Sequence, residues 1–463
     1  MRGLRLSHYL LLVVGLTVTP ASAQQLPSPG VAALPANTPE IIPDRYIVEL
    51  HRGAPIDAVA HGHGVAPAVR FRIINGFAAR MSHAAATALS RDPRVKRVSP
   101  DVVVRAFAKP ASPPGKTKGG SPGGGGTSAS CPTPPPATDE QVATGVARIG
   151  APDAWALGHK GDGVKVAVID TGIDLCHPDL AANYVEGTNF IDSSQPPRDD
   201  NGHGTHVAGI IAAPQNGTGV VGVAPNAKLL AAKVLDASGA GSLSTIVSAL
   251  DWAVQKGARV VNLSLGAADF WCTFGMCGAG SECTAISNAA ASGVVVVVAA
   301  GNSADEALFY TPANCRDSLT VSALDASTNQ FASFSNHSVY YWDVDGDEAF
   351  TLNDHPVVDL VAPGVNVLST MPTYDVTLTA TYGVSKNYGV LSGTSMATPH
   401  VAGAAALYIG AHAAAPADQV RQALVGGGEC AGTTAAAGGV VCGGGWLFDP
   451  DGVWEPLVDA AGL

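Results

Sequence analysis

Ser395 stands in a sequence context that suits a nucleophile. It follows a Gly-Thr turn and comes directly before an alanine-rich apolar run that predicts a buried helix. A serine at the start of a helix is exposed to an incoming carbonyl group, and free N–H groups there point at the negative charge that develops on the carbonyl oxygen. Serine alone is a poor nucleophile, so it needs a base that a third group holds in place. Acyl transfer by Ser395 therefore requires two partners elsewhere in the chain.

Both partners occur upstream of Ser395. Asp170 ends the apolar run 166–170, which predicts a strand, and His203 opens a helix in the motif Gly-His-Gly-Thr-His206. In this interpretation His203 takes the proton of Ser395 and returns it to the leaving amine, while Asp170 fixes the tautomer of the imidazole. His206 lies one helical turn after His203 and could form a metal pair with it, but we interpret it as a structural neighbour.

The chain resembles the subtilisin-like (subtilase) serine endopeptidases from about Val142 to its C-terminus. The three motifs come in the order Asp, His, Ser that this family uses. The resemblance implies hydrolysis of peptide bonds through an acyl-enzyme, and it makes the side-chain amide of Asn302 a donor to the oxyanion, beside the backbone N–H of Ser395. It also implies a secreted endopeptidase that is made as a zymogen.

Two alternatives stand beside this interpretation. A processing protease with narrow targets would be supported by the long segment 270–283, which holds three cysteines. A catalytically inactive binding protein on the same fold would have no reason to keep Asp170, His203, Ser395 and Asn302 together. Profiling of cleaved peptides separates the first alternative from a broad endopeptidase.

Composition and the first residues bound the class of protein. The chain has 463 residues, of which 46% are apolar, enough for one large core and a small second domain. Residues 1–23 follow the pattern of a secretory signal peptide, with two arginines, an apolar run over 9–18 and the small residues Ala-Ser-Ala at the end. We therefore expect a secreted protein, extracellular or periplasmic. We expect no membrane span, because no stretch is long and apolar enough.

Eight cysteines fit an oxidising compartment, and their even number permits four disulfide bonds. Spacing does not fix their connectivity. We favour a local bond between Cys430 and Cys442. Three cysteines crowd the segment 272–283, so at least one of them pairs further away, with Cys315 as a candidate, or stays free.

Charge is distributed unevenly along the chain. Residues 41–106 hold ten Arg and Lys against five Asp and Glu, a net charge of +5, whereas residues 138–463 hold eleven against thirty-two, a net charge of −21. A basic segment and an acidic body favour two domains that attract each other, although acidity could equally serve only to keep an exported enzyme soluble. The acidic body argues against nucleic-acid binding, and we expect a monomer without membrane contact.

The N-terminal part predicts a small α+β domain at 24–106, with its core at about 41–106. Its strand and helix patterns lie at 45–50, 69–81, 84–90 and 95–106. The stretches Asn75-Gly-Phe-Ala-Ala and Val95-Lys-Arg-Val-Ser-Pro-Asp resemble the inhibitor propeptide of subtilases. The resemblance implies a domain that assists folding and blocks the active site until it is cut off, so the protein's own propeptide is an expected partner besides protein and peptide substrates.

Residues 107–137 are dominated by Pro, Gly, Ser and Thr, which predicts a flexible linker because such a run cannot bury a core. We expect the maturation cut between about residues 106 and 138. The catalytic domain then spans 138–463, where Val-rich strand patterns lie at 164–169, 228–235, 260–265, 294–300, 319–323 and 357–360. Helical segments alternate with them, which predicts an α/β fold with a mostly parallel sheet and helices on both faces.

A residue-by-residue match to the family implies where a substrate strand binds. Main-chain hydrogen bonds come from two strand edges, and side-chain preference comes from the adjacent pockets. The edges and pocket walls are Gly239, Ala240, Gly241, Ser264, Leu265, Gly266, Ala300 and Gly301, with Leu243 in an outer apolar pocket. No carboxylate in these segments would select Arg or Lys, so we expect a broad preference for apolar or small residues.

Calcium is the cofactor that the resemblance implies, in a structural role. The loop 213–220 matches the calcium loop of the bacterial subtilisins. The ligands would be the side chains of Asp179 and Asn216 and the carbonyl groups of Pro214, Thr218 and Val220, with Gln141 closing the site. Ligands that are all oxygen atoms suit this hard cation. The alternative is an ordinary Asn-Gly turn.

An acidic segment near the middle of the catalytic domain offers a second candidate calcium site. Asp343, Asp345 and Asp347 alternate, and Asp354 stands at the twelfth position counted from Asp343, as an acid does in an EF-hand loop. Glu348 occupies the sixth position, where that loop requires glycine. The alternative is a solvated acidic hairpin.

Overall fold

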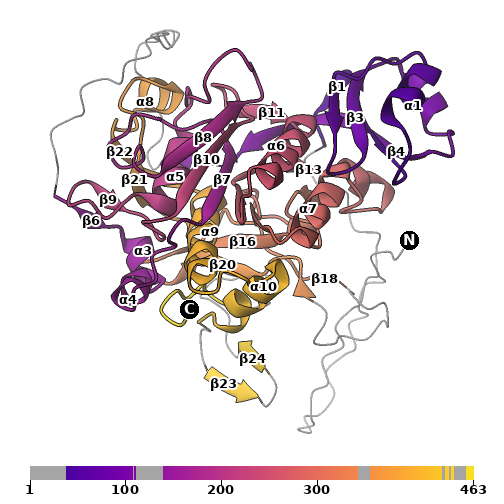
Figure 1. The fold of residues 1–463 in the computed structure, drawn as a ribbon. Coiled ribbons are helices and arrows are strands. Elements are labelled where there is room, and N and C mark those ends of the chain that lie inside the picture. Colours follow the sequence, from indigo (N-terminus) through magenta and orange to yellow (C-terminus); the bar gives the residue numbers. More distant parts are fainter. Residues whose placement is uncertain are drawn as a thin grey trace, which may run out of the picture.

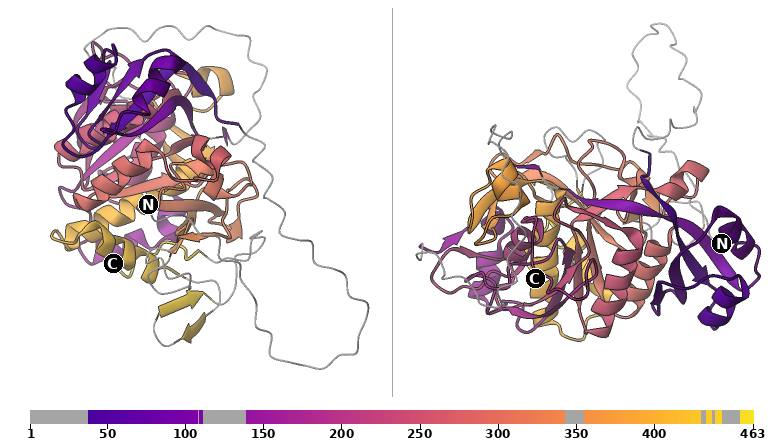
Figure 2. Two further views of the ribbon diagram at one scale, coloured as in Figure 1. Left: turned by 90° about the vertical axis from the view of Figure 1, so that its right-hand side faces the viewer. Right: turned by 90° about the horizontal axis from the view of Figure 1, so that it is seen from above.

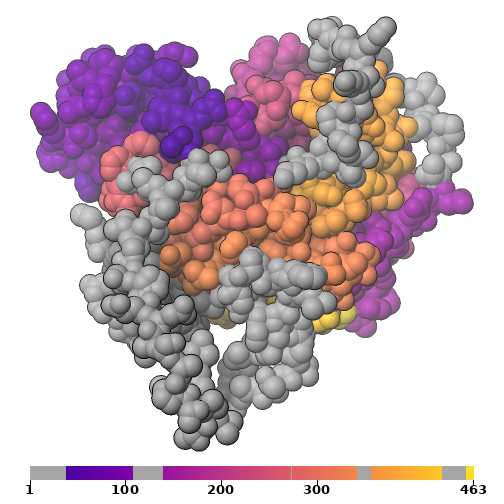
Figure 3. Space-filling model, turned by 180° about the vertical axis from the view of Figure 1, so that it is seen from behind, coloured from indigo at the N-terminus to yellow at the C-terminus, as the bar shows by residue number. Residues whose placement is uncertain are grey.

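Two domains pack against each other in this protein (Figure 1). A computed structural model describes residues 38–107, 109–110, 139–342, 355–429, 433–436, 439–442 and 455–463. Seen from behind, the smaller N-terminal domain forms a separate lobe at one corner of the molecule (Figure 3). Each domain has a hydrophobic cluster of its own, so each has the core that a folded unit requires.

The N-terminal domain is an antiparallel sheet with two short helices against one face. Its elements are β1 (Ile41–Leu50), α1 (Ile56–Gly62), β2 (Val69–Phe71), β3 (Gly76–Arg80), α2 (His83–Leu89) and β4 (Val95–Ala106). β1 pairs with β3 and β4, and β2 pairs with β3. Because successive side chains alternate in direction, Val48 packs into this domain's own core, whereas Ile47 packs into a core of the larger domain. The predicted α+β domain is confirmed.

The larger domain is built on an eight-stranded sheet. Its strands are β7 (Lys165–Asp170), β8 (Tyr184–Asn189), β10 (Lys228–Lys233), β12 (Val260–Leu263), β14 (Val295–Ala299), β16 (Leu319–Asp325), β17 (Gln330–Phe331) and β20 (Leu360–Pro363). The order is β17-β16-β14-β12-β7-β10-β8, with β20 beside β16. Only the pair of β16 with β17 is antiparallel within this sheet of the described chain. The predicted mostly parallel sheet is confirmed.

Helices cover both faces of this sheet (Figure 1). One face carries α5 (His203–Ala212) and α9 (Thr394–Ala411), and the other carries α6 (Leu243–Gln255) and α7 (Ser281–Ala291). Within β7, Val166 and Val168 pack toward α5 and α9, whereas Ala167 and Ile169 pack toward α6 and α7. Strands that are buried on both faces need apolar residues at every position, which explains the Val-rich runs of the sequence.

Shorter elements surround the sheet. The helical ones are α3 (Thr144–Arg148), α4 (Ala151–Ala156), α8 (Thr377–Tyr382), α10 (Ala417–Gly426), η1 (Phe270–Phe274) and η2 (Ala307–Phe309). The strands are β5 (Lys109–Pro110), β6 (Gln141–Val142), β9 (Val220–Val221), β11 (Ala240–Ser242), β13 (Leu265–Ala268), β15 (Tyr310–Thr311), β18 (Tyr341–Trp342), β19 (His355–Pro356), β21 (Val367–Thr370), β22 (Tyr388–Ser392), β23 (Thr433–Ala436) and β24 (Gly439–Cys442).

The strand β4 joins the two domains. One part of it pairs with β1 inside the N-terminal domain, and its last residues pair with β11 and β13 of the larger domain. Figure 2 shows this strand leaving the N-terminal lobe and running across the larger domain. The C-terminal end of the N-terminal domain is thus inserted into the body of the molecule.

One strand begins later than the sequence predicted. The pattern at 357–360 was expected to be a strand, but β20 spans Leu360–Pro363. Val357 and Val358 are apolar for a different reason, because they pack into a small cluster with Ala300 and Leu308 outside the main core.

Two disulfide bonds lie within the described residues. Cys272 bonds to Cys277, and Cys283 bonds to Cys315, which confirms the candidate partner. Cys176 is also disulfide-bonded. The bond expected between Cys430 and Cys442 involves a residue outside the described ranges. Within those ranges, no helix combines the length and the apolar composition that crossing a bilayer demands.

Candidate active site

Asp170 and His203 form a buried pair where a strand ends and a helix begins. β7 carries Asp170 at its last position, and α5 begins at His203. Both side chains are at most 1% exposed. Nδ1 of His203 lies 2.8 Å from Oδ1 and 2.9 Å from Oδ2 of Asp170. In the described part of the molecule, the buried Nε2 of His203 has no hydrogen-bond partner and is therefore free to accept a proton.

Ser395 is the second residue of α9 and is fully buried. Its Oγ donates a hydrogen bond to the backbone oxygen of Ser264 (2.9 Å) and accepts one from the backbone N–H of Phe107 (3.1 Å). Phe107 directly follows β4, so a residue from the end of the N-terminal domain touches the candidate nucleophile. No hydrogen bond joins Ser395 to His203 among the described residues, because the hydroxyl is engaged by these two groups.

The carbonyl oxygen of Phe107 lies at the predicted oxyanion donor, Asn302. Nδ2 of Asn302 donates to this oxygen at 2.9 Å. The other end of the amide, Oδ1, accepts from the backbone N–H and the hydroxyl of Thr394, both at 2.9 Å, which fixes the orientation of the side chain. Sequence reasoning missed Thr394 as a support, although the Gly-Thr-Ser turn contained it. Gly393 has φ of 155°, and a Cβ there would meet the Phe107 oxygen at 2.3 Å.

The predicted substrate edges are occupied by the chain's own residues 103–107. β11 pairs antiparallel with β4, setting Ala240 opposite Arg105 and Gly241 opposite Val104. On the same side, the N–H of Ala106 donates to the oxygen of Gly239, just before β11, at 3.0 Å. β13 pairs with β4 from the other side. The strand therefore lies between two edges, as an extended substrate would.

The predicted pocket residues lie around the side chains of residues 103–107. The Phe107 ring packs against Gly266, where an added Cβ would come within 2.7 Å of its Cε2 atom. Val104 is fully buried in one cluster with Leu243 and Leu265. Ala300 and Gly301 are also buried, and the amide of Asn336 holds them by donating to the Ala300 oxygen at 2.9 Å.

The chain continues on the far side of the site. Lys109 and Pro110 form β5, which pairs antiparallel with β22 so that Lys109 lies opposite Ser392 and Pro110 opposite Leu391. Backbone pairing therefore holds the chain both before and after the Phe107 carbonyl group. The composition of residues 107–137 predicted a linker, and backbone pairing needs no apolar side chains, so composition gave no sign of this contact.

A disulfide-bonded segment lies beside the site. We call residues 269–283 the cysteine loop. The carboxylate of Asp269 accepts from the backbone of Trp271 (2.8 Å) and of Gly278 (2.9 Å) and from Nδ2 of Asn314 (2.6 Å). Arg97 of β4 lies over the Trp271 ring, 5.6 Å from its centroid. The loop therefore contacts the N-terminal domain.

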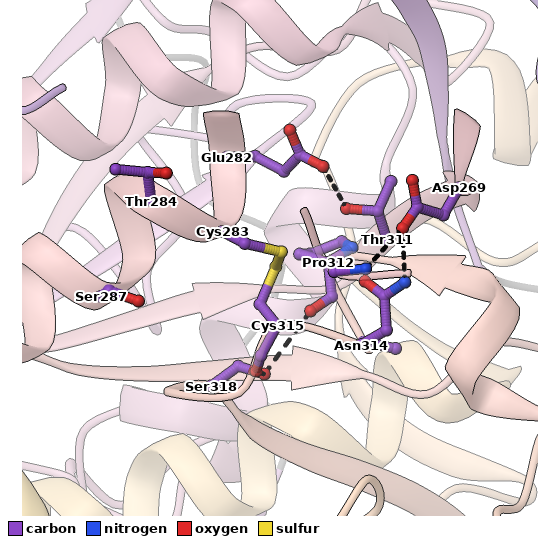
Figure 4. The surroundings of a disulfide bond; sticks show 12 residues. Asp269, Glu282, Cys283, Thr284, Ser287, Thr311, Pro312, Asn314, Cys315 and Ser318 are labelled. Carbon is purple, nitrogen blue, oxygen red and sulfur yellow. Dashed lines mark hydrogen bonds between the residues drawn. A yellow bond between two sulfur atoms is a disulfide. The ribbon is translucent and has the colours of Figure 1, made fainter. Parts of the chain in front are cut away.

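Glu282 is a buried acid at the end of this loop (Figure 4). It is 3% exposed, and its Oε1 accepts from the Thr311 hydroxyl at 2.8 Å. Burial, and then the charge of Asp269, raise the pKa of Glu282 to about 7. Thr311 pairs with Ala267 of β13, so this acid stands behind the strand that forms one of the predicted substrate edges.

A buried carboxylate of the N-terminal domain contacts the start of α6. Asp101 of β4 is fully buried, and its carboxylate accepts from the backbone (3.1 Å) and the hydroxyl (2.6 Å) of Ser244, in the first turn of α6. Nη2 of Arg45 lies 3.0 Å from Oδ2 of Asp101. Acidic side chains are favoured at helix N-termini because unpaired N–H groups point there. Burial raises the pKa of Asp101.

The predicted calcium ligands are brought together around Asp179, which is fully buried. Its Oδ1 accepts from Nδ2 of Asn216 (3.0 Å), and its Oδ2 accepts from the backbone of Val220 (2.9 Å). Asn216 also contacts Thr218, and β6 sets Gln141 opposite Val220. Pro214 lies in the same loop, between α5 and β9. The second candidate site, Asp343 to Asp354, lies outside the described residues.

The arrangement defines a class of protein. A family model described as the subtilase family matches residues 161–435, and one described as peptidase inhibitor I9 matches residues 61–107. The chain belongs to the subtilase family, whose members are serine endopeptidases, and its N-terminal domain is an inhibitor-type propeptide.

Curated relatives agree with this assignment. Subtilisin E of Bacillus subtilis (strain 168) is 36% identical over 359 residues, which cover 77% of this chain and 76% of the relative. Subtilisin Savinase of Lederbergia lenta is 44% identical over 268 residues, 58% of this chain and 84% of the relative. An alkaline protease of Alkalihalobacillus alcalophilus is 44% identical over 268 residues, 58% of this chain and 60% of its own length. The last match thus spans less than two thirds of that relative.

Proposed function

We propose that this protein is a secreted endopeptidase that cuts its own chain between Phe107 and Ala108 and so separates propeptide from catalytic domain. The observation that carries the proposal is the hydrogen bond from Asn302 to the carbonyl oxygen of Phe107, directly beside Ser395. The N–H of the same residue contacts the Ser395 hydroxyl, so we infer that the carbonyl group held by the oxyanion donor is the one that the serine attacks. The bond after it is therefore the bond that breaks.

The proposed mechanism assigns one role to each group. The proton of Ser395 passes to Nε2 of His203 while Oγ forms a bond to the carbonyl carbon of Phe107. Asn302 donates to the resulting oxyanion, and Asp170 stabilises the imidazolium through Nδ1. His203 then gives the proton to the nitrogen of Ala108, which leaves as a free amine. Water hydrolyses the acyl-enzyme with His203 again as the base.

We propose a preference for apolar side chains, aromatic ones included, immediately before the cut. The Phe107 ring lies against Gly266, where a larger residue would collide with it. Val104, three residues earlier, is buried beside Leu243. This pattern supports the broad apolar preference expected from the sequence and extends it to a large ring.

The propeptide would remain bound as an inhibitor after the cut. Its hold on the catalytic domain includes Asp101 with Ser244 and the pairing of β4 with β11, and none of these contacts depends on the Phe107–Ala108 bond. A bound propeptide keeps Phe107 at the site and excludes other substrates. Release of the propeptide is then the step that yields active enzyme.

We also propose that calcium binds at Asp179. A buried carboxylate, the amide of Asn216 and the backbone of the loop 213–220 meet there, and oxygen ligands of this kind suit calcium. Asp179, Asn216, Pro214, Thr218, Val220 and Gln141 would hold the ion. Its role would be to join the start of the catalytic domain to this loop.

Export through the signal peptide 1–23 and a monomeric state are proposals from the sequence alone.

The test compares the purified wild-type zymogen with Ser395→Ala. We expect the wild type to yield a catalytic chain that starts at Ala108, by intact mass and N-terminal sequencing, and Ser395→Ala to stay uncut. Ser327→Ala, at an exposed serine in a turn, is the matched control and should be cut like the wild type.

Two outcomes would count against the proposal in different ways. Identical trimming of wild type and Ser395→Ala would mean that another protease makes the cut. A cut that needs Ser395 but leaves a first residue other than Ala108 would contradict the assigned bond and leave the nucleophile in place.

A further inference from the structure

Asp199 is a fully buried carboxylate just ahead of α5 that accepts five hydrogen bonds. Oδ1 accepts from the hydroxyl of Thr171 (2.9 Å) and from the backbone N–H groups of Asn201 (3.0 Å) and Gly202 (2.8 Å). Oδ2 accepts from the backbone N–H (2.9 Å) and the hydroxyl (2.6 Å) of Thr205. These donors come from the end of β7, from the loop before α5 and from the first turn of α5.

The same network touches both members of the Asp170–His203 pair. Thr171 directly follows Asp170, and its backbone N–H donates to Oδ1 of Asp170 at 2.6 Å. The Thr171 hydroxyl, which donates to Asp199, also accepts from the backbone N–H of Gly204 at 2.9 Å. Gly204 directly follows His203. One hydroxyl therefore connects the residue after the aspartate with the residue after the histidine.

The start of α5 depends on these acceptors. Its N-cap residue is Gly202, which has no side chain to accept the first N–H groups of the helix. Asn201, Thr171 and Asp199 take that role, since they accept from the backbone of His203 (3.2 Å), Gly204 and Thr205. Unsatisfied N–H groups at a buried helix end are costly, and an anion there is favoured.

We propose that Asp199 is a positioning residue that sets the distance and orientation between Asp170 and His203. It acts by tying the end of β7 to the start of α5 through Thr171 and Thr205. The inference rests on the proposed catalytic roles of Asp170 and His203. Among the described residues, no hydrogen bond joins the Asp199 carboxylate to Phe107 or to the imidazole of His203.

Replacement by asparagine should disrupt this arrangement at nearly constant volume. Each carboxylate oxygen of Asp199 is surrounded by donors, so an amide nitrogen in place of either oxygen would face N–H or O–H groups. At least two hydrogen bonds would be lost, and buried donors would be left unpaired. The start of α5 would then lose its fixed position relative to β7.

The experiment measures two reactions in Asp199→Asn. One is the first-order rate of self-cleavage of the purified zymogen, which does not involve substrate binding from solution. The other is the kinetics of the mature enzyme on a peptide with phenylalanine before the cut, normalised to titrated active sites. We expect kcat to fall about 10- to 100-fold with KM within about twofold, because β11 and β13 still bind the substrate.

The pH profile separates positioning from stability. In Asp199→Asn, a misaligned Asp170 would stabilise the imidazolium of His203 less than in the wild type. The acidic limb of kcat/KM should therefore move to lower pH, by about half a unit or more. Thr171→Ser keeps the hydroxyl and should retain the wild-type rate and limb. Thr171→Val removes it and should behave like Asp199→Asn. Asp192→Asn, at an exposed turn aspartate that accepts from Ser194, is the charge-matched control and should match the wild type.

The results that overturn the inference are specific. If Asp199→Asn melts earlier but its titrated sites keep the wild-type kcat and acidic limb, Asp199 is merely structural. If Asp199→Asn does not fold, Thr171→Val takes its place in the test. The inference is then overturned if Thr171→Val has the kcat and the acidic limb of the wild type. A wild type that shows no self-cleavage would instead contradict the proposed function.

Discussion

Glu282 is a buried acid whose pKa lies near neutral pH. The carboxyl group accepts from the Thr311 hydroxyl and from its own backbone N–H, whereas that of the neighbouring Asp269 accepts from Trp271, Gly278 and Asn314. Burial, and then the charge of Asp269, raise the pKa of Glu282 from 4.5 to about 7. An isolated carboxylate is poorly stabilised in such surroundings, and the neutral acid is favoured.

This pKa predicts how stability depends on pH. The unfolded chain loses the Glu282 proton near pH 4.5, whereas the folded chain keeps it up to about pH 7. The free energy of unfolding should therefore fall as the pH rises from about 4.5 to about 7, and this contribution should stay constant above that. The shift corresponds to about 3 kcal/mol. Glu282→Gln should remove that loss, because an amide still accepts from Thr311 and does not ionise.

Urea unfolding of the Ser395→Ala zymogen at pH 5 and pH 8 measures this effect without self-digestion. Adding Glu282→Gln should stabilise the protein more at pH 8 than at pH 5. Glu186→Gln, at a partly exposed acid that pairs with Lys256, is the control. Equal effects of Glu282→Gln at the two pH values would show that the acid is already ionised at pH 5.

At the scale of elements, the proposed calcium site joins parts that are distant in sequence. β6, near the start of the catalytic domain, pairs with β9, and the loop before β9 approaches Asp179. A Cβ at Gly219 would come within 2.0 Å of Oδ2 of Asp179, so the loop comes very close to this carboxylate. The proposed ion would strengthen this junction.

Calcium should therefore stabilise the Ser395→Ala zymogen against heat. At a free concentration about 100-fold above its dissociation constant, the ion should add about 2.7 kcal/mol. Thermal unfolding in excess calcium and in EDTA measures the gain, and Asp179→Asn should abolish most of it. Asp192→Asn should keep the full response. A melting temperature that is equal in calcium and EDTA would contradict the site.

Sequence patterns predicted the elements but not every contact between them. The Val-rich strands were predictable because burial on both faces demands apolar residues throughout, and the motifs predicted Asp170, His203 and Ser395 as the catalytic residues. The sequence did not reveal that Phe107 would lie at the candidate nucleophile Ser395, because strand pairing uses backbone groups that every residue has. It also did not single out Asp199 or Thr394, since acids and hydroxyls near turns are common and only the fold brings these to the site.

At the scale of the whole molecule, the two domains carry opposite net charges and also make direct contacts with each other. The propeptide region 41–106 is basic and the catalytic domain is acidic. Arg45 reaches across the interface to Ser244 (2.8 Å), and the buried Glu49 accepts from Thr284 of α7 at 3.3 Å. The long-range attraction between the basic propeptide region and the acidic catalytic domain is screened by salt, whereas buried contacts between them are screened much less.

Salt should therefore speed activation of the cut complex. We expect the lag before peptide hydrolysis to shorten as NaCl rises from about 0.02 M to about 0.5 M, because screening weakens the attraction that returns a dissociating propeptide. The already active enzyme, measured in the same buffers, is the control for direct effects of salt on catalysis. A lag that stays constant or lengthens would mean that charge does not contribute to retention of the propeptide.

The path of the chain through the site also limits what the enzyme can digest. Residues 103–107 are extended between two strands on one side of the Phe107 carbonyl, and residues 109–110 pair with β22 on the other. A target must present a similarly straightened stretch, with its own backbone groups unpaired, on both sides of the bond to be broken. Compact proteins offer such stretches only where they unravel locally, so the rate at which a native protein is degraded should report how often that region opens.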